Sequence, residues 1–152
     1  MTTAGVNGAA DGELSAEPIE VAFPLPRAPQ TNIYLQLRDN GPNILLFLTT
    51  ASTDSVATPP LGTFVYAMPN RVNPSGTFST PLFTQTSTID FTTRLAKVLA
   101  RKLGKPVYVG NSMSFANAGM GGTVEEEMEG FKQVVEVVVK LLNEGKVSDG
   151  TN

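Results

Sequence analysis

Residues 90–111 read DFTTRLAKVLARKLGKPVYVGN, an amphipathic run that leads through Gly-Lys-Pro into a short apolar segment. Apolar side chains recur at helical spacing and basic side chains occupy the opposite face. The apolar set is Phe91, Leu95, Val98, Leu99 and Leu103. Gly104 sits where a helix end favours positive φ, and Pro106 prevents continuation of the helix. The stretch therefore predicts one helix followed by a strand at 107–109. The expected N-cap is one of Ser87, Thr88 or Asp90.

A second helix is predicted downstream, where Thr123 and Glu126 have the spacing of a capping box. The expected apolar stripe of this helix is Val124, Met128, Phe131, Val135, Val138 and Leu142. The run VVEVVVKLL is rich in β-branched residues, so a strand over 134–139 is the alternative. We favour the helix because the stripe spans the whole segment. The extra apolar residues of its C-terminal half need a cover, either the core or a partner.

Upstream, residues 31–38 (TNIYLQLR) alternate between apolar and polar, the period of a half-buried strand. The sequence DNGP at 39–42 predicts a turn, and residues 43–50 (NILLFLTT) predict the returning strand of a hairpin. This second strand is apolar on both faces, as expected in the middle of a sheet. Further strands are expected at 62–68 and, as edge strands because of their prolines, at 79–85 and 19–25.

The chain contains neither histidine nor cysteine. Nucleophilic triads, imidazole metal ligands, disulfides and thiolate sites are therefore excluded, and an enzyme would have to use carboxylates, Lys, Tyr or a bound cofactor. A net charge of -3 argues against nonspecific nucleic-acid binding. No long apolar stretch or secretory leader is present, so no membrane partner is expected. The lack of cysteine fits a reducing compartment, and we expect the cytoplasm, with the nucleus as a second location.

One loop could bind a small molecule. Residues Gly119 to Thr123 (GMGGT) are rich in glycine and precede a predicted helix, where free N–H groups could receive a phosphate. Three glutamates follow at once and would repel an anion, so a plain connector is the favoured interpretation. The same glutamates could be imagined as a carboxylate or metal site, but a solvated cluster in the first helical turn is the more common case.

Five of the eleven basic residues lie in one stretch of twelve residues, which covers most of the first predicted helix and the turn that follows it. They are Arg94, Lys97, Arg101, Lys102 and Lys105. A local patch of this kind can dock an acidic partner even when the net charge is negative, and an ordinary solvated helix face is the alternative. RNA is a poorer fit because no aromatic residue interleaves the patch.

Four segments of the chain carry a resemblance to a known family. The two main segments are TTRLAKVLARKLGKPVYVGNSMS and EEEMEGF, and the two supporting segments are NIYLQLRDNGPNILLFL and TFVYAM. Together they resemble the proteasome assembly chaperone 4 family in a fungal form. The resemblance covers about residues 31–132 and is most specific over 92–131. The loops at 51–61 and 70–76 and the leader before residue 19 are longer than in animal members. The GMGG segment has no counterpart in the family.

The resemblance implies an α+β protein with an antiparallel sheet of about six strands and two helices. We expect a disordered leader at 1–18, a single domain at 19–144 and a frayed tail at 145–152. Such a protein forms a heterodimer with a proteasome assembly chaperone 3-like subunit. The pair binds proteasome α subunits, especially the fifth, promotes ordered assembly of the 20S α ring and then leaves. No enzymatic activity and no cofactor are implied.

Contacts with these partners can be assigned only as hypotheses. The charge stripe suggests Arg94, Lys97, Arg101 and Lys102 for binding an α subunit. An exposed sheet face or edge is a suitable heterodimer interface, with aromatic anchors because aromatic residues dominate interface energetics. The expected anchors are Tyr34, Phe47 and Tyr66. Packing of these three rings in the core is the alternative.

Overall fold

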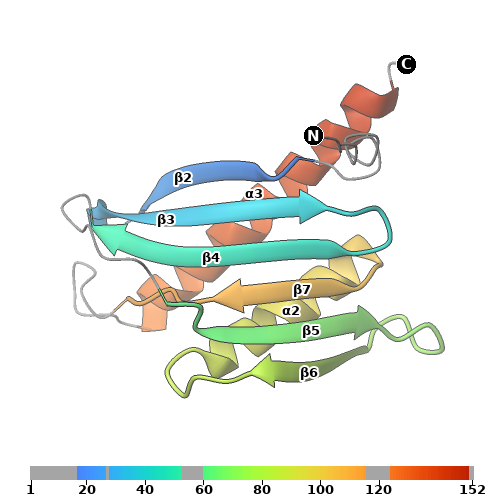
Figure 1. Ribbon diagram of the computed structural model, residues 1–152, viewed down its shortest axis with the longest axis horizontal. Helices are drawn as coiled ribbons and strands as arrows, with labels where there is room; N and C mark the ends of the chain where they lie inside the picture. The colour runs from blue at the N-terminus through green and yellow to red at the C-terminus, as the bar shows by residue number, and fades with distance from the viewer. Residues whose placement is uncertain (1–16, 27, 53–59, 116–123, 151–152) are drawn as a thin grey trace, which may run out of the picture.

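The protein was described from a computed structural model, in which residues 17–26, 28–52, 60–115 and 124–150 are described (Figure 1). This part of the chain contains six strands and two helices. In chain order they are β2 (Ile19–Leu25), β3 (Ala28–Asp39), β4 (Ile44–Ser52), β5 (Thr63–Pro69), β6 (Thr77–Phe83), α2 (Ile89–Leu103), β7 (Val107–Asn111) and α3 (Val124–Gly150). The expected α+β class, with about six strands and two helices, is confirmed. The predicted leader at 1–18 lies almost entirely outside the described residues.

The six strands form one sheet in the order β2-β3-β4-β7-β5-β6. The expectation of an antiparallel sheet holds for every neighbouring pair except β4 and β7, which are parallel. The exception arises because the chain leaves β4, builds β5, β6 and α2, and then returns β7 to the centre between β4 and β5. The last strand in the sequence thus joins two antiparallel halves.

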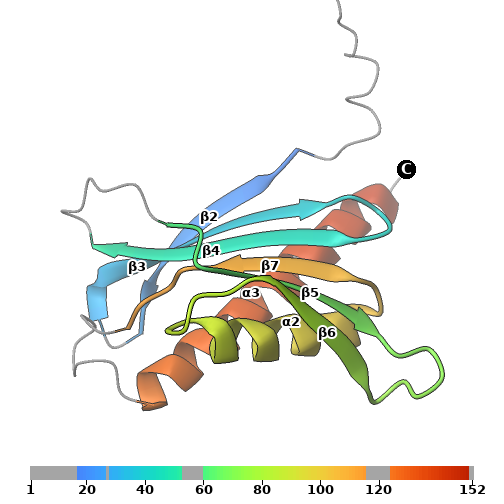
Figure 2. The same ribbon diagram turned by 60° about the horizontal axis from the view of Figure 1, so that its bottom comes forward.

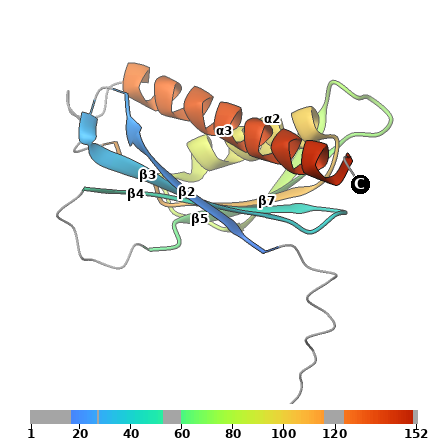
Figure 3. The ribbon, with the colours of Figure 1, turned by 90° about the horizontal axis from the view of Figure 1, so that it is seen from above.

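Both helices cover the same face of the sheet (Figures 2 and 3). In Figure 1 the viewer looks at the other face, and the helices pass behind the strands. The helix α2 lies behind β5 and β7, whereas α3 runs diagonally behind β3 and β4. The described part of the protein is therefore a two-layer structure, with helices on one side of the sheet and none on the other.

The core lies between these two layers. Alternation in β3 and β4 directs one side chain of every two toward the helices, so Leu37, Ile44 and Leu46 have no exposed surface. From α2, Leu95 and Leu99 pack against the sheet and are also fully buried. The hairpin, the central strand and the first helix predicted from the sequence therefore meet in one hydrophobic core.

The start of α2 is fixed by a buried polar network. Thr88 is the N-cap residue, but its side chain makes no capping hydrogen bond. Its hydroxyl instead pairs with the hydroxyl of Thr63 on β5 at 2.8 Å. Thr92 donates to the Thr88 carbonyl at 2.6 Å and accepts a hydrogen bond from Asn111 on β7 at 3.1 Å. The expected cap position is therefore correct, but the hydroxyl holds the helix to the sheet.

The end of α2 follows the prediction. Gly104 adopts a left-handed conformation with φ of 70°, and its N–H donates to the Ala100 carbonyl. The next residue, Lys105, reaches the β3–β4 turn, where its Nζ lies 3.4 Å from an Asp39 carboxylate oxygen and donates to the Gly41 carbonyl at 2.9 Å. The helix end and the hairpin turn are thus tied together.

The buried stripe of α3 differs from the prediction at its N-terminal end. Val124 and Met128 are 71% and 63% exposed, whereas a row of buried positions follows a four-residue spacing. This row is Glu126, Gly130, Val134, Val138 and Leu142, and Val135 is buried beside it. Along this row the helix lies close to Phe115, because an added Cβ at Gly130 would lie 2.8 Å from its ring.

The remaining predictions for α3 have mixed outcomes. The run at 134–139 is helical, as favoured over a strand, and Val135, Val138 and Leu142 of the expected stripe are buried. The helix α3 extends to Gly150, and the expected domain boundary at 144 with a frayed tail at 145–152 stays a prediction. Thr123, the proposed capping residue, lies outside the described residues.

The two outer strands are those that the prolines indicated. β2 forms one edge of the sheet and β6 the other. Pro81 lies inside β6 opposite Val65, and Pro69 ends β5 opposite Thr77. Proline has no N–H to donate, which confines it to such positions.

Candidate binding surfaces

The sheet surface turned away from the helices carries the largest cluster of aromatic side chains in the described structure. We call it the open face. It comprises Tyr34 and Gln36 of β3, Leu45 and Phe47 of β4, Tyr108 of β7, Phe64, Tyr66 and Met68 of β5, and Phe78 and Phe83 of β6. The strand register places these residues on one side because directly paired residues share a face.

The aromatic rings form a continuous strip across the central strands. The rings of Phe47 and Phe64 stack with centroids 6.0 Å apart and planes 9° apart. Phe64 lies 6.1 Å from Tyr108, which contacts Tyr66 at 4.8 Å. Offset and tilted pairs at these distances are favourable arrangements for aromatic rings. The ring–ring contacts within the strip therefore hold the aromatic side chains in place, and together they form an apolar surface.

Gly110 makes room for this strip in the middle of β7. It pairs with Phe47 on one side and with Phe64 on the other. A Cβ at Gly110 would lie 2.6 Å from the Phe47 ring and 3.3 Å from Leu61. Because glycine has no side chain, the two phenylalanine rings can close over the backbone of β7.

A hollow of about 300 Å³ lies on the open face beside this strip. Phe47, Leu61 and Gly110 form its apolar part, and Tyr34 and Glu20 contribute polar groups. Gln36 donates a hydrogen bond to Glu20 at 3.0 Å across the β2–β3 pair. The open face is therefore apolar over its centre and polar toward the β2 edge, an arrangement common in protein interfaces.

The predicted anchors Tyr34, Phe47 and Tyr66 all lie on the open face. Tyr34 is 40% exposed and the other two rings are half-buried, so packing in the main core is excluded for all three. Sequence reasoning missed the neighbouring rings Phe64 and Tyr108. The alternation of TFVYAM could have identified Phe64, whereas Tyr108 joins the strip only because β7 inserts in the centre of the sheet.

The predicted basic residues occupy the other side of the molecule. Arg94, Lys97 and Arg101 are exposed on α2, whose opposite side packs on the sheet. Lys102 is also exposed and turns toward α3. The one ion pair within the described ranges joins Lys105 to Asp39. We call Arg94, Lys97, Arg101 and Lys102 the basic row; none of the four has a carboxylate partner in the described structure.

Other candidate sites receive no support. The Gly119 to Thr123 loop lies outside the described residues, so its proposed phosphate site stays a prediction. Within the described ranges no group of three or more acidic side chains is placed to hold a metal ion. No helix in those ranges is long and apolar enough to cross a membrane.

In the described part of the chain, one face of the mixed sheet carries an aromatic cluster and the helical layer carries exposed cations, which is typical of a protein that acts by binding other proteins. The comparisons identify the family. A model described as proteasome assembly chaperone 4 matches residues 32–113, more than half of the chain. The protein therefore belongs to the proteasome assembly chaperone 4 family.

A solved structure has the same fold. The crystal structure of a chaperone complex for yeast 20S proteasome assembly matches with a TM-score of 0.62. The alignment covers 84% of this chain and 97% of the yeast chain, with 15% sequence identity. None of the curated proteins compared with the sequence matches it. The family model thus supports the class of function, and the yeast structure supports the fold.

Proposed function

We propose that this protein is a non-catalytic chaperone that forms a heterodimer with a related, proteasome assembly chaperone 3-like subunit. The pair binds proteasome α subunits, the fifth in particular, promotes ordered assembly of the 20S α ring and is then released. The work is done in the cytoplasm or nucleus by binding energy alone. Membership of the proteasome assembly chaperone 4 family supports this proposal.

The observation that carries the pairing proposal is the open face. Met68, Phe78 and Phe83 are 37%, 58% and 57% exposed, although they continue the aromatic strip. Large exposed apolar patches are typical of protein interaction sites. A second sheet stacked on this face would lie roughly 10 Å away, and the two layers of side chains would interdigitate.

The basic row supports binding of an α subunit. It lies on the helical side, so a partner on the open face leaves it accessible (Figure 3). Two separate surfaces let one chaperone hold its partner and a subunit together, which lowers the entropy cost of bringing neighbouring subunits into register. Release then requires only a competing surface, such as that of a later subunit.

Matched methionine variants test the pairing surface. Met68→Asp places a charge on the open face, and Met128→Asp makes the same change on α3. The tagged chain is co-expressed with its chaperone partner, and captured proteins are identified by mass spectrometry. We expect Met68→Asp to weaken capture of the partner at least tenfold and Met128→Asp to leave it unchanged. Equal capture by both variants would rule out the open face.

The α-subunit surface is tested separately. Replacing Arg94, Lys97 and Arg101 with Glu should weaken capture of α subunits and reduce its dependence on salt, while pairing with the second chaperone persists. Unchanged affinity for the α subunit at low salt would contradict the role of the basic row. Failure of the natural chain to recover any proteasome subunit would contradict the proposed function itself.

A further inference from the structure

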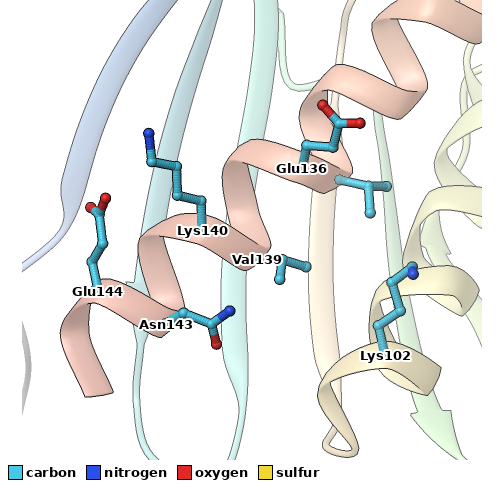
Figure 4. Close-up of a pocket in the computed structure, with 7 residues that line it drawn as sticks. Lys102, Glu136, Val139, Lys140, Asn143 and Glu144 are labelled. Atoms are coloured by element: carbon cyan, nitrogen blue, oxygen red, sulfur yellow. The ribbon is translucent and has the colours of Figure 1, made fainter. Parts of the chain in front are cut away.

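A groove separates the C-terminal parts of the two helices. Near the start of α2, Phe91 contacts Phe131 of α3 with ring centroids 5.4 Å apart. Toward the C-terminal end of α2, an open groove of about 620 Å³ lies between the two helices. It is bordered by Lys102 on α2 and by Val135 and Val139 on α3 (Figure 4). The groove lies in the helical layer, on the side opposite the open face.

The floor of the groove is apolar. Val135 is 9% exposed, and Val139 is half-buried and points toward α2 (Figure 4). Apolar side chains from a visiting segment would remove the remaining surface of these valines from water, which is favourable by roughly 25 cal/mol per Å². The floor therefore favours a segment with an apolar face.

The charges on the two walls differ. On the α2 wall, Lys102 lines the groove and is exposed. It has no carboxylate within 4 Å in the described structure. On the α3 wall, Glu136 and Glu144 alternate with Lys140. The α2 wall thus carries positive charge alone, whereas the α3 wall carries two carboxylates and one ammonium group.

We propose that this groove binds an acidic amphipathic helix of a proteasome α subunit. Its apolar face covers Val135 and Val139, and its carboxylates pair with Lys102. Helices commonly bind in grooves between other helices through apolar residues spaced three and four apart. The identity of the partner rests on the proposed function. The preference for an acidic amphipathic helix rests on the residues that line the groove.

The charge difference also fixes the orientation of the bound helix. Its acidic flank faces α2, where Lys102 is the only charged residue of the wall, because the same carboxylates placed against α3 would meet Glu136 and Glu144 on either side of Lys140. Docking in this orientation adds a third helix to the layer without disturbing the open face. The groove therefore provides the apolar contacts and the shape that fits the bound helix, whereas the basic row attracts the acidic partner from a distance.

The first experiment measures binding of a labelled probe peptide to the full chain by fluorescence anisotropy. The probe is an amphipathic helix of roughly 16 residues with leucines on one face and glutamates on one flank, and its twin has lysines in place of the glutamates. We expect the acidic probe to bind with a Kd that rises with salt and the basic twin not to bind. Equal binding of the two probes, or binding of neither, would overturn the proposal.

Charge reversals on the two helices provide a matched control. Lys102→Glu changes the groove wall, whereas Lys132→Glu makes the same change in net charge at an exposed position of α3 that neither borders the groove nor belongs to the basic row. We expect Lys102→Glu to weaken the acidic probe at least tenfold and Lys132→Glu to change it no more than about twofold. Similar effects of both variants would reduce the interaction to general charge attraction and overturn the proposal.

The apolar floor has its own control. Val139→Asn should weaken the acidic probe several-fold, and Val137→Asn, a change at another half-buried position of α3 outside the groove, should not. Urea unfolding of each variant verifies that it is folded. Equal weakening in two folded variants would contradict a defined floor.

Capture of α subunits from lysate separates the two proposals. If the natural chain captures the subunit and the double variant Lys102→Glu/Val139→Asn captures it equally well, the groove proposal fails and the proposed function stands. If the natural chain captures no subunit, the proposed function fails, and with it the identity of the groove's partner. Loss of capture in the double variant alone supports both proposals.

Discussion

The two faces of the sheet are built by the same strands, but the two helices pack against only one of them. In β4, Leu46 points to the helices and is fully buried, whereas its neighbour Leu45 points to the open face and is only half-buried. The helix face is filled by leucine, isoleucine and valine from the strands. The open face carries most of the aromatic rings. In the described part of the chain, the two helices thus cover one of the two apolar sheet surfaces, and no helix covers the other.

The difference in side chains fits this difference in cover. Branched aliphatic residues fill the close-packed interior between the sheet and the helices. Tyrosine has an apolar ring and a polar tip, so Tyr34, Tyr66 and Tyr108 tolerate water in the lone chain and still present a large apolar area to a partner. The helix face therefore serves stability, and the open face is suited to association.

The largest expected effect separates the faces at adjacent residues. Leu46→Ala should lower the free energy of unfolding by about 3 kcal/mol, because it removes buried methyl groups and leaves a cavity. Leu45→Ala should cost about 1 kcal/mol or less in the isolated chain. Urea denaturation measures both. Equal losses would mean that the open face contributes to the core of the lone chain as strongly as the helix face does.

The next effect concerns the aromatic strip. Gly110→Ala should destabilise the chain by about 2 kcal/mol, because the new Cβ would overlap the ring of Phe47. In a Phe47→Ala background the same change should cost much less, since the overlapping ring is gone. Urea denaturation of the two single variants and the double variant gives this coupling. Additive losses would show that the ring and Gly110 are not in conflict.

A smaller effect is expected from the buried polar network. Thr92→Val removes the hydroxyl that accepts a hydrogen bond from Asn111, whose side chain is 1% exposed. The unpaired amide should cost about 1.5 kcal/mol. Thr93→Val, the same change at the half-buried neighbouring position, should stay within about 0.5 kcal/mol. A neutral Thr92→Val would indicate that Asn111 finds another acceptor.

The smallest effect is expected outside both faces, where Lys105 joins the hairpin turn. Lys105→Met should cost about 0.5 kcal/mol, and the loss should shrink at high salt because the ion pair with Asp39 is partly exposed. Thermal unfolding at two salt concentrations measures this. A loss as large as that of Leu46→Ala would show that the end of the sheet, and not its covered face, governs stability.

Local signals in the sequence predicted most of the elements. The spacing of Leu95 and Leu99 fixed the buried side of α2, Gly104 marked its end, and the alternation around Leu35 predicted β3. These patterns succeed because they depend on periodicity and backbone preference within a few residues. The sequence left open whether Tyr34, Phe47 and Tyr66 pack in the core or on an exposed face, and the strand register places all three on the open face.

Long-range arrangement was not predictable in the same way. Nothing in the sequence of β7 indicates that it inserts between β4 and β5, which makes one pair parallel and brings Tyr108 beside Phe64. The side of α3 that faces the core includes Gly130, which lies close to Phe115, and Met128 lies on the exposed side; the contact joins segments that periodicity within α3 does not relate. The groove between the helices depends on the same packing, so periodicity could not reveal it.

The prolines at the β6 edge have a consequence for chains that have not yet met a partner. Hydrogen-bonded and non-hydrogen-bonded pairs alternate along β5 and β6. The Asn70 N–H donates to the Gly76 carbonyl, so the next pair, Pro69 with Thr77, is non-hydrogen-bonded, and the pair of Val65 with Pro81 belongs to the same class. The missing N–H of Pro81 therefore faces outward, where an incoming strand would need a donor. An exposed sheet edge is a template for pairing with another chain, and a proline there interrupts the template. At the β6 edge, a chaperone chain without its partner is thus protected against pairing with further strands.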